Sequence, residues 1–209
     1  MIGAEFKKQI AKSFGQEMRK LGFKGTGLQY FQETEDFLFA VYIELGRWGG
    51  HCTAGFAVHP KEIKKDSEGK LNLKKLKIYE YEFKMGLSKH SKEQWWKYTD
   101  EEKINHQTLS EILQLIKTKT FPVFDLFRSK PNLLELFKVS DLKDFYKVCK
   151  KKAGITIDTT ETRFAWALAI YFERKNLSKA KQFAKYGLSD LEEDDTFFGR
   201  RDFKRILLR

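Results

Sequence analysis

The sequence predicts an α+β fold: an N-terminal helix packed on an antiparallel sheet of about four strands, followed by a helical C-terminal half. Three observations lead to this prediction. Residues 4–21 repeat apolar side chains at four-residue steps, as one face of a helix does. Segments with strand character follow, up to about residue 84. After residue 90 the apolar spacing is helical almost to the end of the chain.

The opening helix is the first predicted element. Four apolar residues define its buried face: Phe6, Ile10, Phe14 and Met18. Gly22 is placed to end the helix, because glycine accepts the left-handed conformation common at helix ends. Residues 23–27 are then expected to form a turn.

Four segments have strand character: 28–34, 37–45, 52–58 and 76–84. Segment 37–45 is apolar at odd and even positions alike, which indicates a central strand covered on both faces. Segment 76–84 alternates aromatic with charged residues, so we expect an outer strand whose Glu80 and Glu82 face water. The intervening lysine-rich residues 60–75 are expected to be a loop with one helical turn.

The second half is predicted to be helical over 100–117, 132–137, 141–152, 159–175, 178–186 and 198–208, with an apolar turn near 121–127. Thr99 is predicted to cap the first of these helices, with Glu102 completing a capping box. Gly187 is predicted to end the helix over 178–186. We therefore expect an α+β domain at residues 1–137 and a helical extension at residues 138–209.

The chain of 209 residues is basic, with 40 Lys and Arg against 29 Asp and Glu and a formal net charge of +11. Residues 60–98 hold 11 basic and 6 acidic residues, and most of this excess lies in segment 61–77, which includes Lys64 and Lys65. Such a stripe favours binding to phosphates. Lysine greatly outnumbers arginine, however, and sites that read bases favour arginine. Nucleic-acid binding through segment 61–77 is therefore the alternative function.

An ordered set of motifs carries a family resemblance. The motifs are Leu21-Gly22-Phe23-Lys24, Tyr30-Phe31, Val41-Tyr42-Ile43-Glu44, Ala54-Gly55-Phe56-Ala57-Val58, Trp95-Trp96-Lys97-Tyr98 and Phe121-Pro122. Over about residues 4–137 this order resembles the bacterial domain-of-unknown-function family 4304. The resemblance implies an α+β fold with an antiparallel sheet. It implies no reaction, so no catalytic residue is carried over.

Residues 158–189 are similar to one tetratricopeptide-type helix pair. Its small and aromatic positions are matched by Ala167, Leu168, Tyr171, Asn176, Ala180, Ala184 and Gly187. A single copy is visible, whereas stable arrays need about three. We therefore expect an ordinary helical hairpin.

The familiar catalytic motifs are absent from the sequence: the P-loop, the dinucleotide-binding glycine motif, the zinc motif His-Glu-x-x-His and the nucleophile motif Gly-x-Ser-x-Gly. The four histidines (His51, His59, His90 and His106) match no metal-ligand spacing. Cys52 and Cys149 are expected to be reduced and inert. We expect no catalytic residue, no metal and no cofactor, and an enzyme of unrecognised type is the third alternative.

The loop Gly46–Gly50 places Arg47 and Trp48 between glycines at a predicted hairpin tip. Trp48 is either an exposed binding anchor or a ring folded back onto the sheet. Trp95 and Trp96 are adjacent, so at least one is expected to pack inward. The candidate interaction residues are Arg47, Trp48, Lys64, Lys65, Trp95 and Trp96.

The leading prediction is a bacterial, cytoplasmic, non-catalytic protein-interaction module, in an accessory or immunity-type role beside another protein. The N-terminal residues lack an apolar signal core, and no run of eighteen apolar residues occurs. We therefore expect neither secretion nor membrane insertion.

Overall fold

The computed structural model describes residues 2–89, 94–192 and 195–209, so His90 lies outside the described residues. The chain divides into two compact units. Unit 1 comprises Met1–Val58 and Lys84–Asp125, and unit 2 comprises His59–Phe83 and Leu126–Arg209. The segment 59–83 belongs to the same unit as the C-terminal helices.

The opening helix of unit 1 is continuous in three parts. These are α1 (Ile2–Gln9), a π-helical turn η1 (Ile10–Phe14) and α2 (Gly15–Lys20). The predicted apolar face, from Phe6 to Met18, is buried. Gly22 follows with a φ of 84°, a left-handed conformation that favours glycine. The predicted helix over 4–21 is confirmed.

Among the described residues the main sheet has six strands, where the sequence predicted about four. They are β1 (Lys24–Thr26), β2 (Gln29–Glu33), β3 (Phe37–Leu45), β4 (His51–Pro60), β7 (Phe83–Gly86) and β8 (Trp96–Lys97). The order is β1-β2-β3-β4-β7, and β8 also pairs with β4. The register of the antiparallel pair β2–β3 places Tyr30 opposite Val41. The expected turn at residues 23–27 contains the short strand β1.

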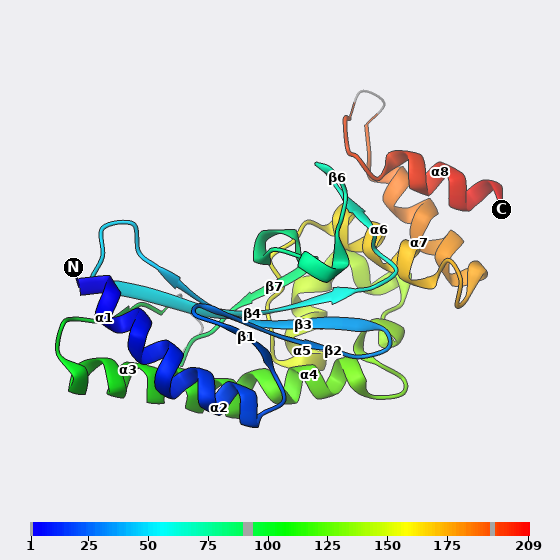
Figure 1. The fold of residues 1–209 in the computed structure, drawn as a ribbon. Helices are drawn as coiled ribbons and strands as arrows, with labels where there is room; N and C mark the ends of the chain where they lie inside the picture. Colours follow the sequence, from blue (N-terminus) through cyan, green and yellow to red (C-terminus); the bar gives the residue numbers. More distant parts are fainter. Residues whose placement is uncertain (1, 90–93, 193–194) are drawn as a thin grey trace. The chain divides into compact units, whose positions relative to one another are not determined.

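Helices cover one face of this sheet. The second helical run is α3 (Glu102–Leu115), a π-helical turn η4 (Ile116–Thr120) and α4 (Phe121–Arg128). Figure 1 shows α1, α2 and α3 on the same side of the sheet. The ring of Phe124 lies 4.6 Å from that of Phe39 in β3 and 5.7 Å from that of Phe56 in β4. An aromatic cluster therefore fills the layer between sheet and helices.

The start of α3 differs from the predicted capping box. Glu101, not Thr99, is the N-cap. The side chain of Asn105 instead accepts a hydrogen bond from Thr99 N and donates one to Thr99 O, both at 2.9 Å. A buried amide thus satisfies the backbone ahead of the helix, a role that the Thr-x-x-Glu pattern does not reveal.

The predicted outer strand over 76–84 is wrong in most of its length. Residues Ile78–Glu80 form the 3₁₀ turn η3, and the strand β7 begins only at Phe83. Tyr79 is exposed, whereas Glu82 is 3% exposed. Glu82 is buried because it pairs with Arg163, which the alternation of residues cannot show. The expected loop before it contains β5 (Lys65–Asp66), β6 (Gly69–Lys70) and the 3₁₀ turn η2 (Leu73–Lys75).

The rest of unit 2 is helical. It contains the 3₁₀ turns η5 (Leu133–Leu136) and η6 (Val139–Asp144), then α5 (Phe145–Ala153), α6 (Glu161–Phe172), α7 (Leu177–Ser189) and α8 (Arg200–Leu208). The expected hairpin is α6 with α7, and α8 packs on α7 as a third helix (Figure 1). The chain has the predicted α+β fold.

Gly187 lies inside α7 and does not end it, contrary to the prediction. A Cβ atom at this position would lie 2.2 Å from the ring of Phe203 in α8. Glycine is present because two helices approach closely there, not because the helix stops.

Within the described residues, no helix combines the length and the apolar character needed to cross a membrane. Both cysteines are free and buried. Burial raises the pKa of the Cys52 thiol, and likewise that of Cys149, to about 12. Neither thiol is an activated nucleophile.

Candidate interaction surface

Backbone hydrogen bonds anchor the base of the loop between β3 and β4. Gly46 N donates to His51 O at 2.8 Å, and Gly49 N donates to Gly46 O at 3.0 Å. Gly49 and Gly50 both have positive φ angles, 77° and 72°, which other residues rarely adopt. Tyr98 N donates to Gly50 O at 2.9 Å. These hydrogen bonds anchor the base of a loop that extends away from the helices of unit 1, and the glycines permit its tight turn (Figure 1).

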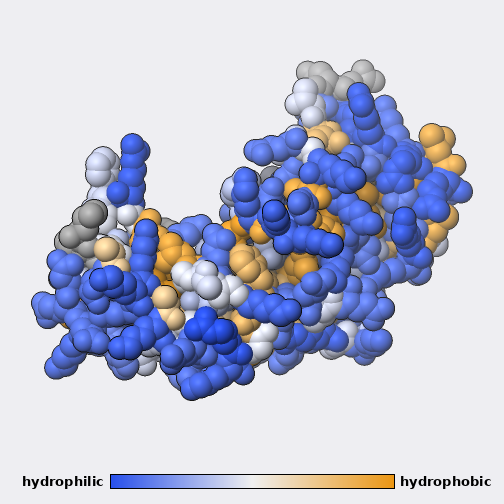
Figure 2. Space-filling view, viewed as in Figure 1, coloured by the Kyte–Doolittle hydropathy of each residue, from blue (hydrophilic) through white to orange (hydrophobic). Residues whose placement is uncertain are grey.

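Trp48 at the tip of this loop is 91% exposed. The ring does not fold back onto the sheet, which was the other interpretation of the sequence. The guanidinium carbon of Arg47 lies 5.2 Å from the centre of the Trp48 ring, within cation–π range. Figure 2 shows the loop standing clear of the rest of unit 1.

The two adjacent tryptophans separate as expected, with one turned inward. Trp96 is buried and lies opposite Cys52 in the β4–β8 pair. Trp95 is 55% exposed, and its ring lies 3.6 Å from where a Cβ of Gly46 would be. Trp95 therefore covers the base of the loop that carries Trp48.

The same strand pair adds two polar side chains to this corner. His51 lies opposite Lys97, and both are exposed. We call the set Arg47, Trp48, His51, Trp95 and Lys97 the tryptophan surface. His51 and Lys97 were not among the predicted interaction residues. The sequence does indicate Lys97, because residues two apart in a strand point to the same face, and Trp95 is exposed. His51 follows from its pairing with Lys97.

The predicted lysines of segment 61–77 lie in unit 2 and differ in their surroundings. Lys64 is exposed. Lys65 is half-buried, and its Nζ lies 2.8 Å from Asp202 Oδ2. The carboxylate of Asp202 also accepts a hydrogen bond from Trp166 Nε1 at 2.9 Å. Lys65 thus ties the β5–β6 hairpin to α6 and α8.

A buried polar cluster in unit 2 was not predicted. Both Glu82 oxygens accept hydrogen bonds from Arg163. Glu82 N donates to His59 Nδ1 at 3.2 Å, so the ring proton is on Nε2, which faces Ile63 O at 2.8 Å. Burial lowers the pKa of His59 to about 4. A neutral histidine with both nitrogens engaged is a structural group.

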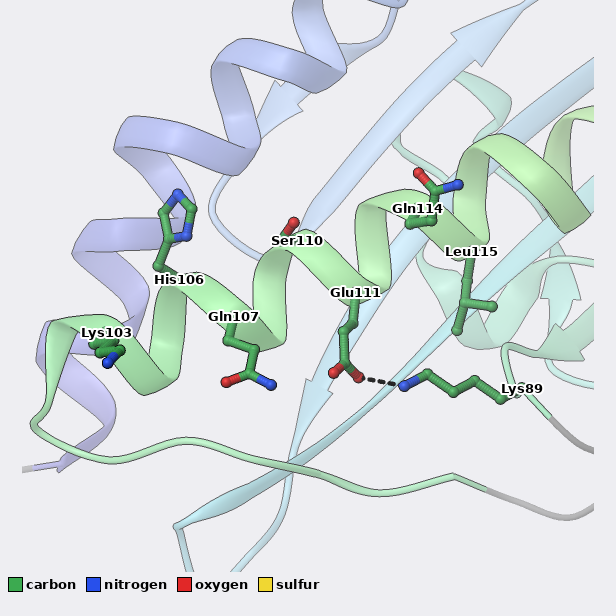
Figure 3. Close-up of a pocket in the computed structure, with 8 residues that line it drawn as sticks. All are labelled: Lys89, Lys103, His106, Gln107, Ser110, Glu111, Gln114 and Leu115. Carbon is green, nitrogen blue, oxygen red and sulfur yellow. Dashed lines mark hydrogen bonds and ion pairs between the residues drawn. The ribbon is translucent and has the colours of Figure 1, made fainter.

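A shallow pocket of about 670 Å³ lies along α3, within the size range of small-molecule sites. Lys89 Nζ lies 2.8 Å from Glu111 Oε2, and this hydrogen bond lowers the pKa of Glu111. Figure 3 shows Gln107 and Glu111 on one side of the helix and His106 on the other. Lys89 and Glu111 pair with each other, whereas His106 points away from them, so these groups do not surround one point.

Within the described ranges, no three His, Cys, Asp or Glu side chains lie together so that they could hold a metal ion. Residues 14–126 match the model of a family described as a domain of unknown function, DUF4304. No curated protein and no solved structure matches the chain. The match spans more than half of the chain and contains the whole tryptophan surface.

Proposed function

The chain belongs to the DUF4304 family, and we propose that it is a non-catalytic protein-interaction module that binds its partner through the tryptophan surface. An accessory or immunity-type role in the bacterial cytoplasm is the form of this function that we propose. The partner is another protein that accepts the Trp48 ring in a pocket.

The exposure of Trp48 is the observation that supports this proposal most strongly. Tryptophan and arginine are the residue types most enriched among binding hot spots. A Trp side chain offers roughly 200 Å², and burying it at about 25 cal/mol per Å² gives about 5 kcal/mol before association costs. Backbone hydrogen bonds at Gly46, Gly49 and Gly50 anchor the base of the loop that presents this ring.

Trp95 supports the same proposal. It is the other largely exposed tryptophan among the described residues, and it lies at the base of the loop that carries Trp48. Two neighbouring indoles with Arg47 and Lys97 beside them give an aromatic centre with a basic rim. This is the composition of a protein interface core and its surroundings.

Affinity capture from a cell lysate with the whole 209-residue chain as bait tests the proposal. The baits are the wild-type chain, Trp48→Ser, and Leu208→Ser as a matched control, since Leu208 is 89% exposed. We expect one protein that is retained by the wild type and by Leu208→Ser in 0.5 M salt and lost from Trp48→Ser. It should form a complex of fixed stoichiometry in light scattering. Equal capture by all three baits would reject the role of Trp48.

Nucleic-acid binding through segment 61–77 is the second candidate function. Five lysines of this segment are exposed: Lys64, Lys70, Lys74, Lys75 and Lys77. Lys77 Nζ also lies 5.4 Å from the ring centre of Tyr79, which is 56% exposed. Lysines beside an exposed ring fit a charged, stacking ligand. Replacing Lys74, Lys75 and Lys77 with glutamine should then abolish binding of an oligonucleotide.

A further inference from the structure

Most of the net positive charge of the chain lies in unit 2. Unit 2 has 26 basic and 17 acidic residues, a net charge of +9, whereas unit 1 has 14 and 12, a net charge of +2. The lysine-rich segment 61–77, with 7 basic and 3 acidic residues, therefore lies in the same compact unit as the basic residues of the C-terminal helices. A surface on this unit is the place to look for a polyanion site.

The exposed side of α5 carries a group of these charges. We define the α5 face as Lys143, Tyr146, Lys147, Lys150 and Lys151, all of them exposed. Lys143 lies in the 3₁₀ turn that leads directly into the helix. The spacing of three and four residues places these side chains on one side of the helix.

These lysines are mostly without acidic partners. In the part of the chain that the structure describes, only Lys147 of the four has an ion pair, with Asp144 at 2.8 Å. By contrast, Arg209 of the same unit pairs with Glu173 at 2.8 Å. Like charges four residues apart on a helix repel. The helix dipole favours lysines in the last turn, as at 150 and 151, but it gives no reason for those at 143 and 147.

Tyr146 is fixed among these lysines. Its hydroxyl donates to Thr159 O at 2.6 Å, and its ring centre lies 3.9 Å from that of Phe145. The side chain nonetheless remains 49% exposed. A ring that is held in place and half open to solvent is ready to stack on a flat ligand without losing further rotamer freedom.

We propose that the α5 face binds single-stranded nucleic acid, with the lysines contacting phosphates and Tyr146 stacking on a base. Charge complementarity and an open ring are the two features that such binding requires. The face has no Arg, Asn or Gln to read base edges in a duplex. Tyr146 is its single aromatic side chain, and it has no aliphatic one, so it lacks the apolar stripe of a membrane-binding helix.

This site is separate from both functions proposed above. It needs neither the tryptophan surface of unit 1 nor the lysines of segment 61–77. Its ligand is recognised by backbone charge and base stacking, so we expect little dependence on sequence.

Fluorescence anisotropy with labelled twelve-nucleotide dT and rU oligomers tests the proposal on the whole 209-residue chain. Four phosphate contacts predict a log–log salt slope of about −3 for a single strand. Replacing Lys143, Lys147 and Lys150 with glutamine should weaken binding at least tenfold and reduce the slope by about 2. The comparison variant replaces Lys74, Lys75 and Lys77 with glutamine, which removes the same charge from segment 61–77. It should weaken binding less than threefold if the α5 face is the site, and it should abolish binding if segment 61–77 is the site.

Substitutions of Tyr146 distinguish base stacking from electrostatic attraction alone. Tyr146→Leu should weaken binding at least fivefold with an unchanged salt slope, because stacking is lost and the lysines remain. Tyr146→Phe loses the hydrogen bond to Thr159 but keeps the ring, so it should bind like the wild type. Circular dichroism melting confirms that each variant is folded.

Four results would each overturn the proposal. The first is no oligonucleotide binding in 50 mM salt. The second and third are an equal loss of affinity in the two triple variants, and a loss of affinity only in the variant at residues 74, 75 and 77. The fourth is binding to phosphatidylserine vesicles in preference to the oligomers. Equal losses would indicate bulk charge, and loss only in the 74–77 triple would indicate the second candidate function.

Discussion

Glu82 and Arg163 form a two-point ion pair across 81 residues of sequence, with Nε to Oε1 at 2.9 Å and Nη2 to Oε2 at 3.0 Å. The pair joins the segment 59–83 to α6 within unit 2. It explains how a glutamate that alternates with aromatic residues comes to be buried. A buried carboxylate is tolerated only where a cation and hydrogen bonds compensate for lost hydration.

Replacing Glu82 with glutamine should therefore destabilise the protein. The change leaves Arg163 without its counter-charge in a partly buried position, and we expect a loss of about 2–3 kcal/mol in the free energy of unfolding. Urea denaturation gives this value. Glu68→Gln, at an exposed position of the same unit, should change it by less than about 0.5 kcal/mol. Equal stability of the two variants would show that the pair contributes nothing.

His59 predicts a pH dependence of stability. Its pKa is about 4 in the folded chain, chiefly because it is buried, and 6.5 when unfolded. Between these values the unfolded state takes up a proton that the folded state does not, so stability falls as the pH decreases from 6.5 to 4. The loss is about 2 kcal/mol by pH 5.

The matched variant for this prediction is His59→Gln, which does not titrate. Urea denaturation at pH 7 and pH 5 should give a difference in unfolding free energy that is smaller by about 2 kcal/mol in the variant. The same pH dependence in both proteins would contradict a buried neutral imidazole.

Gly187 predicts the effect of crowding between α7 and α8. Alanine is the better helix former by about 1 kcal/mol, so Gly187→Ala would stabilise an isolated α7. In the folded chain its Cβ would meet the Phe203 ring, and we expect a net loss of about 1–3 kcal/mol. Adding Phe203→Leu should lower the cost of Gly187→Ala, as measured in a double-mutant cycle of thermal stability. Stabilisation by the single change would argue for a looser helix contact.

Local periodicity predicted much of the fold. The helix over 4–21 follows from the four-residue spacing of its one apolar face. The strand over 37–45 follows from apolar residues at odd and even positions alike, and both parities are buried from Phe37 to Ile43. The prediction of a strand over 76–84 was wrong because the alternation of aromatic and charged residues was interpreted as one buried and one solvent-exposed face. Glu82 lies on the supposed wet face, and its partner lies on a distant helix.

Two glycines also show that a local sequence pattern does not reveal contacts with distant elements. Gly22 and Gly187 both follow an amphipathic helical pattern, and in sequence both look like helix ends. Gly22 has the left-handed φ of such an end, whereas Gly187 makes room for Phe203. Only the position of α8 distinguishes them.

The candidate sites were predicted in part. Gly46, Gly49 and Gly50 indicated a loop that presents Arg47 and Trp48, but exposure of the ring depended on the fold. The α5 face was missed although its lysine spacing is visible in the sequence. Residues 60–98 hold the largest local excess of positive charge and so drew attention away from this helix. Lys143, Lys147 and Lys150 recur at helical spacing, which is the pattern that indicates a basic helix face.

Titration calorimetry of the partner protein against the wild-type chain and Trp48→Ser is the most direct test of the proposed function. If Trp48 anchors the complex, the Kd for Trp48→Ser is at least thirtyfold weaker, equivalent to about 2 kcal/mol of binding free energy. The melting temperature should be unchanged, since the indole is 91% exposed. A Kd within threefold of the wild-type value would contradict the claim that Trp48 anchors the complex.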